Sequence, residues 1–271
     1  MAAGCGGGNT SSPAAKPAAP QAPATGIRPP DTLTEKGYLT FGTISTFPPF
    51  EYMKDGKLVG FDVDLVDALA KEMGLKAKNT VMNFDGLIPA LQGGRFDMIV
   101  SGMYIKPERR EMVDFIGYMK LSNVIVTRKG DNKGIKSMDD LSGKKVAVVR
   151  AGYTEILCRE QNKRLAELKK PLIDILLLPT ENDVVLATEQ GRADAFLHSA
   201  PGAAHLSEQK PNVFEVPVTM PPNAEIGIAT RKGNDKTRAA LEAAVKKLVA
   251  DGTYEKLMQK YHLPPELNYF K

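Results

Sequence analysis

The pattern of apolar and polar positions contains one helix-then-strand unit twice. Residues 87–101 (LIPALQGGRFDMIVS) and 184–198 (VVLATEQGRADAFLH) each hold apolar positions at helical spacing, a Gly-Arg-x-Asp turn and a short apolar run that predicts a strand. Each run ends in a polar residue at the same offset, Ser101 in the first copy and His198 in the second. Two such copies predict two similar α/β lobes. Because ligands of open α/β sheets lie beyond the carboxyl ends of strands, we expect Ser101 and His198 to face each other across a cleft.

The rest of the pattern predicts further elements around these units. Strands are expected over residues 38–43, 123–127, 146–149 and 225–230, and helices over residues 62–73, 236–250 and 254–261. The chain therefore builds part of one lobe, crosses into a second, and returns to the first for its terminal helices. Two crossings between lobes make a hinge, which is typical of a clamshell binder.

The first 36 residues differ in composition from the rest of the chain. They are rich in Gly, Ala, Pro and Ser and poor in large apolar side chains, which predicts a disordered segment. The opening Ala2-Ala3-Gly4-Cys5 resembles a bacterial lipoprotein processing site, in which the cysteine carries the lipid anchor and the following polar tract is a tether. The alternative is a tail with one cysteine and no function.

Charge and cysteine content exclude several classes of function. The 271 residues carry a net charge of +4, and the positive residues are scattered rather than gathered on one basic face, so we expect no nucleic-acid partner. The sequence contains no run of eighteen apolar residues, so no membrane span is expected. Two cysteines and three separated histidines show no metal-ligand spacing, so neither a metal nor a cofactor is expected.

Seven short motifs in order resemble those of the bacterial extracellular solute-binding proteins that serve ABC importers of polar amino acids. They are Gly60–Leu65 (GFDVDL), Phe84–Gln92 (FDGLIPALQ), Pro107–Arg109 (PER), Val113–Phe115 (VDF), Leu141–Val146 (LSGKKV), Gly191–Ala195 (GRADA) and Asp251–Tyr254 (DGTY). The resemblance runs from about residue 37 to residue 263.

This resemblance implies a type II periplasmic-binding-protein clamshell, an α/β fold whose two lobes are mixed sheets flanked by helices and joined by two hinge crossings. After a tether over residues 1–36, we expect one lobe from residues 37–121 and 227–271 and the other from residues 122–226.

The resemblance also implies a ligand site. Arg109 matches the arginine that clasps the ligand carboxylate, and its planar fork of donors suits that role. Phe47 and Phe84 match the aromatic residues that sandwich the ligand side chain. The alternatives are a surface arginine and two core aromatic residues.

Further positions around the expected cleft carry hydroxyls, amides or rings. Ser101, Gly102 and Thr154 match positions that offer hydroxyl and amide groups to the ligand, although turns and helix caps favour the same residue types. Tyr104 stands where the family usually has a smaller hydroxyl residue. Tyr153 does the same, and is expected to fill part of the pocket.

His198 departs from the family pattern. The resemblance implies an aspartate at this position, paired with the α-ammonium group of the ligand, and Ile44 stands where relatives for lysine or arginine carry an acid. Without either acid, we expect the site to favour anionic ligands. The alternatives are that Glu155, Glu181 or Asp183 supplies the missing carboxylate, or that His198 has a structural role.

The sequence therefore predicts a binding protein rather than an enzyme. It captures an amino acid or related carboxylate for the permease of an ABC importer, as a monomer in the periplasm or at the cell surface, with Cys5 as its lipid anchor. Two alternatives remain on the same fold: a lyase resembling cyclohexadienyl dehydratase, and a ligand-sensing module.

Overall fold

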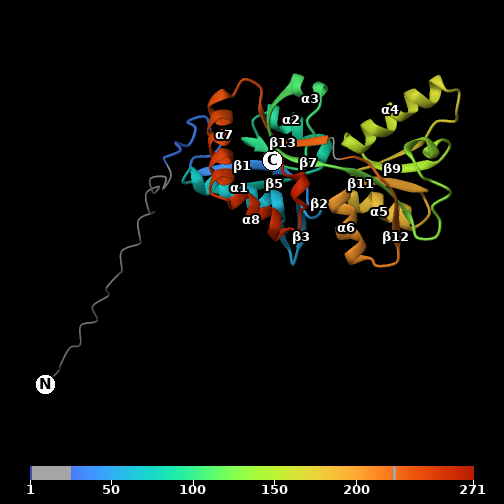
Figure 1. Cartoon of the computed structure of the whole chain (residues 1–271). Coiled ribbons are helices and arrows are strands. Elements are labelled where there is room, and N and C mark those ends of the chain that lie inside the picture. Colours follow the sequence, from blue (N-terminus) through green and yellow to red (C-terminus); the bar gives the residue numbers. More distant parts are fainter. Residues whose placement is uncertain (2–25, 222–223) are drawn as a thin grey trace.

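The computed structural model describes Met1 and residues 26–221 and 224–271. Two five-stranded mixed sheets lie side by side and helices cover both of them (Figure 1). Cys5, the expected lipid anchor, lies outside the described residues. Ile27 and Leu33 pack against the core of the first sheet, so contacts with that sheet begin within the residues assigned to the tether.

The first sheet has the strand order β5-β1-β6-β13-β7. Strand β1 runs parallel to β5 and β6, whereas β13 runs antiparallel to β6 and β7. The strands are β1 (Tyr38–Thr43), β5 (Lys76–Val81), β6 (Met98–Ile99), β7 (Val113–Leu121) and β13 (Ala224–Arg231). The helices packed on them or on each other are α1 (Phe61–Glu72), α2 (Leu87–Gln92), α3 (Pro107–Met112), α7 (Asp235–Ala250) and α8 (Thr253–Lys260).

The second sheet repeats this arrangement with the order β10-β9-β11-β8-β12. Strand β9 runs parallel to β10 and β11, and β8 runs antiparallel to β11 and β12. The strands are β8 (Asn123–Arg128), β9 (Lys145–Val149), β10 (Asp174–Leu178), β11 (Ala195–Ser199) and β12 (Phe214–Thr219). Helices α4 (Tyr153–Glu167), α5 (Glu181–Glu189) and α6 (Ala200–Gln209) pack against them.

A small antiparallel sheet lies beside the first large sheet. Its strands are β2 (Thr46–Phe47), β3 (Glu51–Lys54) and β4 (Lys57–Val59), and a turn at Asp55 and Gly56 joins the last two. Short 3-10 turns are formed by Phe84–Gly86, Met138–Leu141 and Pro265–Leu267.

Local sequence accounts for the two longest helices of the first sheet. In α1, Asp62 lies in the first turn, where its charge suits the helix dipole, and Leu65 and Leu69 form the buried stripe. In α7, the side chain of Asn234 caps the amino end by accepting a hydrogen bond from the Thr237 amide, at 3.4 Å.

The chain crosses between the large sheets twice. Strand β7 ends at Leu121 and β8 begins at Asn123, so one residue separates the two sheets on the outward path. The return path joins β12, which ends at Thr219, to β13, which begins at Ala224. We propose one lobe of residues 37–121 and 227–271 and another of residues 122–226, while β13, a strand of the first sheet, begins three residues earlier at Ala224.

The two repeated units form equivalent elements, α2 with β6 and α5 with β11, one in each sheet. Their ends differ, however. Ser101 lies two residues beyond β6, whereas His198 lies inside β11, which continues through Ser199 into α6.

Candidate functional site

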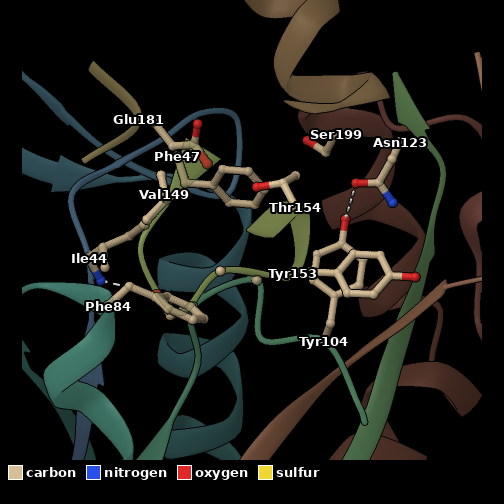
Figure 2. A pocket seen from close by; sticks show the side chains of 13 residues that line it. Ile44, Phe47, Phe84, Tyr104, Asn123, Val149, Tyr153, Thr154, Glu181 and Ser199 are labelled. Carbon is tan, nitrogen blue, oxygen red and sulfur yellow. Dashed lines mark hydrogen bonds between the residues drawn. The ribbon is translucent and has the colours of Figure 1, made fainter. Parts of the chain in front are cut away.

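A cavity with about 440 Å³ of space, its open mouth included, lies where the two sheets face each other. Figure 2 shows side chains from segments beside both large sheets pointing toward the same space. The lining residues are Ile44, Phe47, Phe84, Ser101, Gly102, Tyr104, Asn123, Val149, Gly152, Tyr153, Thr154, Glu181 and Ser199.

Two aromatic residues from the first sheet's side form walls of this cavity. Phe47 ends β2, and its ring packs directly on Gly102, where a Cβ atom would lie only 2.6 Å from Phe47 Cε1. Gly102 also has a φ of 49°, in the left-handed region that favours glycine. Phe84 opens the 3-10 turn that precedes α2. Both rings thus line the predicted site.

A pair of stacked tyrosines closes another side of the cavity. The Tyr104 and Tyr153 rings lie 4.1 Å apart between centroids; Tyr104 comes from the segment after β6 and Tyr153 from the start of α4 (Figure 2). The Tyr104 hydroxyl donates a hydrogen bond to Asn123 Oδ1 at 3.1 Å. The Lys106 ammonium lies 4.4 Å from the centre of the Tyr153 ring, a cation–π contact. The stack therefore fills part of the space, as Tyr153 alone was expected to do.

Arg109 joins the two sheets but does not line the cavity. Its Nη1 donates to the Tyr104 carbonyl and its Nη2 to the Ala151 carbonyl, both at 2.8 Å. The guanidinium also lies 5.4 Å from the centre of the Phe84 ring. Burial lowers the pKa of Arg109 to about 10, so the side chain remains charged at neutral pH. The arginine expected to clasp a carboxylate is held by two backbone carbonyls in this structure.

Ser101 and Gly102 line the cavity, but buried carboxyl groups already accept hydrogen bonds from them. Ser101 Oγ donates to Glu51 Oε1 at 2.9 Å, and the Gly102 amide donates to Asp62 Oδ2 at 3.0 Å. The Tyr118 hydroxyl donates to the same Asp62 carboxyl at 2.8 Å. Burial raises the pKa of Asp62 to about 6 and that of Glu51 well above its ordinary value.

Thr154 lies in the first turn of α4, which opens onto the cavity. Gly152 is the N-cap residue and also lines the cavity, as do Tyr153 and Thr154. The Ala151 amide donates to Glu155 Oε2 at 2.7 Å and the Gly152 amide to the Val149 carbonyl at 3.0 Å. The amides of the first helical turn have no acceptor within a helix, so they are available to an anion.

His198 does not face its expected partner across the cavity. Its ring is buried against Phe47 and Phe196, at 5.7 and 6.0 Å between centroids, and against Gly202, where a Cβ atom would lie 2.4 Å from His198 Cε1. Burial lowers the pKa of His198 to about 4, so the ring is neutral at pH 7. The next residue, Ser199, lines the cavity instead, because successive side chains of a strand point to opposite faces. The expectation of an anionic ligand rested on the absence of an acid at positions 198 and 44, and neither His198 nor Ile44 brings a carboxylate to the cavity.

Of the three acids considered as replacements, only Glu181 lines the cavity. Glu155 accepts from the Ala151 amide and pairs with Arg159 at 2.7 Å, and Asp183 accepts from Thr180 Oγ1 at 2.6 Å. Glu181 Oε2 is buried and has no hydrogen-bond partner among the described residues. Burial raises the pKa of Glu181 to about 8.

Sequence reasoning did not assign Asn123, Val149, Gly152 or Ser199 to the site. Val149 and Ser199 end β9 and β11, whose parallel pairing brings their carboxyl ends to one edge of the second sheet. The rule that ligands lie beyond the carboxyl ends of strands contained this signal. Asn123 begins β8, directly after the crossing, and no sequence pattern singles it out.

The described segments also define what the structure lacks. Within residues 26–221 and 224–271, no helix is both long and apolar enough to cross a membrane. Across the same segments, no three His, Cys, Asp or Glu side chains gather as a metal site.

Comparison with known proteins relates this geometry to one family. Residues 39–264 match the family described as bacterial extracellular solute-binding proteins, family 3. The L-cystine-binding protein TcyJ of Escherichia coli K12 is 32% identical over 84% of this chain and 84% of its own length. The ABC transporter arginine-binding protein 1 of the same strain is 29% identical over 82% of this chain and 90% of its own.

A solved structure shares the fold. It is described as an ancestral arginine-binding protein bound to arginine, with 35% identity and a TM-score of 0.78 over 83% of this chain and 98% of that one. These relatives are binding proteins, and the chain is accordingly a binding protein rather than an enzyme.

Proposed function

Because the chain belongs to the bacterial extracellular solute-binding proteins of family 3, we propose that its ligand is a small solute with a carboxylate, an amino acid in particular, held in the cavity between the two sheets. The observation that carries the proposal is that residues from both proposed lobes line one cavity, with Phe47 and Phe84 from the first and Tyr153, Thr154 and Glu181 from the second. A ligand in that cavity contacts both lobes at once, so its binding favours the closed arrangement that a permease recognises.

The amino end of α4 is our proposed position for the ligand carboxylate. Gly152, Tyr153 and Thr154 line the cavity there, and the helix offers free amides, a hydroxyl and the positive end of its dipole. The Phe47 and Phe84 rings offer apolar surface to the ligand side chain. Cystine and arginine, the ligands for which the two relatives are named, are both amino acids and support this class.

The partner in this proposal is the membrane permease of an ABC importer, which receives the solute from a monomeric binding protein. The family is extracellular, and we propose a periplasmic or cell-surface location with Cys5 as the lipid anchor.

The experiment is a thermal-shift panel of the twenty amino acids, cystine and amine-free carboxylates, followed by calorimetry on those that bind. A ligand at one hundred times its Kd stabilises the protein by about 2.7 kcal/mol, which a melting curve detects. We expect at least one amino acid to bind, and Phe84→Ala to weaken its binding by about tenfold or more, about 1.4 kcal/mol, because an aromatic wall is lost.

Phe270→Ala is the matched control, because Phe270 is exposed and packs on Tyr254 and Tyr269 away from the cavity. Its affinity should equal that of the wild type. If no member of the panel shifts the melting temperature, or if Phe84→Ala binds as tightly as the control, the proposal is wrong.

A further inference from the structure

We propose that Glu181 is the counter-ion for the ammonium group of the ligand, and that it releases a proton when that group binds. The inference rests on the proposed function and narrows the ligand class to solutes that carry a cationic nitrogen, such as zwitterionic or basic amino acids.

The fold directs Glu181 into the cavity. It is the first residue of α5, directly after the cap residue Thr180, whose side chain accepts from the Asp183 amide. Glu181 lines the ligand space, as does Phe47 (Figure 2). Among the described residues that line the cavity, Glu181 is the one acid.

The carboxyl group of Glu181 lacks a hydrogen-bond partner where one is needed. Oε2 is buried, and no donor of the described residues reaches it. A buried acceptor without a partner destabilises the protein, and an ammonium group, with three N–H donors, satisfies it. Two of the donors that line the cavity are already used, since Ser101 Oγ and the Gly102 amide donate to Glu51 and Asp62.

The charged groups around Glu181 do not supply a cation. Glu181 is one of the charges that raise the pKa values of Glu51 and Tyr104, whereas the pKa of Glu181 itself is raised by burial alone. Of the strands packed against α5, β11 brings His198, which burial keeps neutral. Strand β8 brings Arg128, whose Nη1 donates to the Thr188 carbonyl near the other end of α5.

The remaining charges on the packed strands lie at the edge opposite the cavity. Lys145 begins β9 and Asp174 begins β10, and the two pair at 3.0 Å. Val149, at the other end of β9, lines the cavity. Burial alone therefore sets the state of Glu181 in the free protein, where a pKa of about 8 keeps the group mostly protonated at pH 7.

Ligand binding changes this state. An ammonium group close to the carboxyl favours the ionised form, so the protonated acid and the ammonium become a carboxylate–ammonium pair and one proton passes to the solvent. A carboxylate ligand without a cationic group leaves the Glu181 proton in place. Proton release therefore distinguishes the ligand classes.

The test is calorimetry at pH 7 with L-arginine, L-histidine and L-cystine as probes, in buffers that differ in ionisation enthalpy. The dependence of the measured enthalpy on the buffer gives the number of protons released. We expect close to one proton per bound probe for the wild type. Glu181→Gln should release none and bind at least about tenfold more weakly, about 1.4 kcal/mol.

Glu189→Gln is the matched control. It removes an acid from the other end of the same helix, where Glu189 pairs with Lys210, and should release protons as the wild type does. The wild type alone gives a second readout. Its affinity for the probe that binds should rise by about tenfold or more from pH 6 to pH 8, because Glu181 is protonated in a smaller fraction of the free protein at the higher pH.

The outcomes separate the two proposals. If none of the probes nor any member of the thermal-shift panel binds, the proposed function fails. If a probe binds without proton release, with an affinity that is flat between pH 6 and pH 8, or equally well to Glu181→Gln, then the role of Glu181 is overturned and the proposed function stands.

Discussion

Single residues set the shape of the cavity, and Gly102 is the clearest example. Its φ is positive, and a Cβ atom added to it would lie only 2.6 Å from Phe47 Cε1, so there is room for no side chain. The position of the Phe47 ring, and with it one wall of the site, depends on this glycine.

Gly102→Ala should therefore destabilise the protein by about 1–3 kcal/mol and weaken amino-acid binding, because backbone strain and a displaced Phe47 ring act together. Urea unfolding and calorimetry measure the two effects. Gly130→Ala is the control, since Gly130 also has a positive φ, 76°, and nothing within 4 Å of a Cβ atom. Equal losses of stability in the two variants, with unchanged binding, would contradict the packing argument.

The sequence predicted most of the lining residues but not the direction of every side chain. Phe47, Phe84, Ser101, Gly102, Tyr104, Tyr153 and Thr154 all line the cavity. His198 does not, because a shift of one residue along a strand turns the side chain to the other face, and the offset shared by the two repeats could not reveal that Ser199 faces inward. Nor could a motif show that backbone carbonyls surround Arg109.

At the scale of elements, two buried carboxyl groups hold Ser101 and Gly102, which line the cavity, in place. Glu51 of β3 and Asp62 of α1 accept hydrogen bonds from Ser101, Gly102 and Tyr118. Glu51 Oε2 is buried and has no donor in the described part of the chain. A proton on Glu51, shared with the adjacent Asp62, satisfies that oxygen.

These two carboxyl groups should make stability depend on pH. A carboxyl whose pKa is raised by folding stabilises the protein fully below its unfolded pKa, and that contribution is lost as the pH rises through its folded pKa. For Asp62 the window runs from about 3.8 to about 6, and for Glu51 it begins near 4.5. His198, with its pKa lowered to about 4, has the opposite sign and loses its contribution as the pH falls below 6.5.

Glu51→Gln removes the contribution of the Glu51 carboxyl to the pH dependence of stability and leaves that of His198. The amide keeps the acceptor for Ser101 and supplies a fixed donor toward Asp62. We expect the melting temperature of this variant, relative to the wild type, to be higher at pH 8 than at pH 5. Glu255→Gln, a change at an exposed acid paired with Lys271, should show no such difference. If the difference in melting temperature between Glu51→Gln and the wild type is the same at pH 5 and pH 8, Glu51 carries no shared proton.

At the scale of the whole molecule, Arg109 is a bridge between the two sheets. One nitrogen binds the Tyr104 carbonyl and the other the Ala151 carbonyl, on opposite sides of the cavity.

The fold class and the element order were predictable, because periodicity fixes strands and helices one by one. The relative position of the lobes was not, since it depends on such contacts between residues far apart in sequence.

Arg109→Met should leave both carbonyls without their donor and allow the lobes to separate. We expect a larger radius of gyration by small-angle X-ray scattering in the free protein, and amino-acid binding weaker by about tenfold or more, since each hydrogen bond to a charged group contributes about 1.5–3 kcal/mol. Arg110→Met is the control, because Arg110 is exposed and contacts Phe115. Indistinguishable scattering from the two variants would rule out the bridge.

The crossings between the sheets have a consequence for how such a molecule diversifies. The chain leaves and re-enters the first sheet at adjacent points: Leu121 pairs with Ala224, and the Met220 amide donates to the Asn123 carbonyl at 2.8 Å. Everything between them is an insertion with neighbouring ends, the arrangement that domain grafting tolerates best. Genetic exchange of the inserted segment, from Asn123 to Met220, replaces Glu181, Tyr153 and Thr154 together. The rest of the chain, which carries Phe47 and Phe84, stays unchanged.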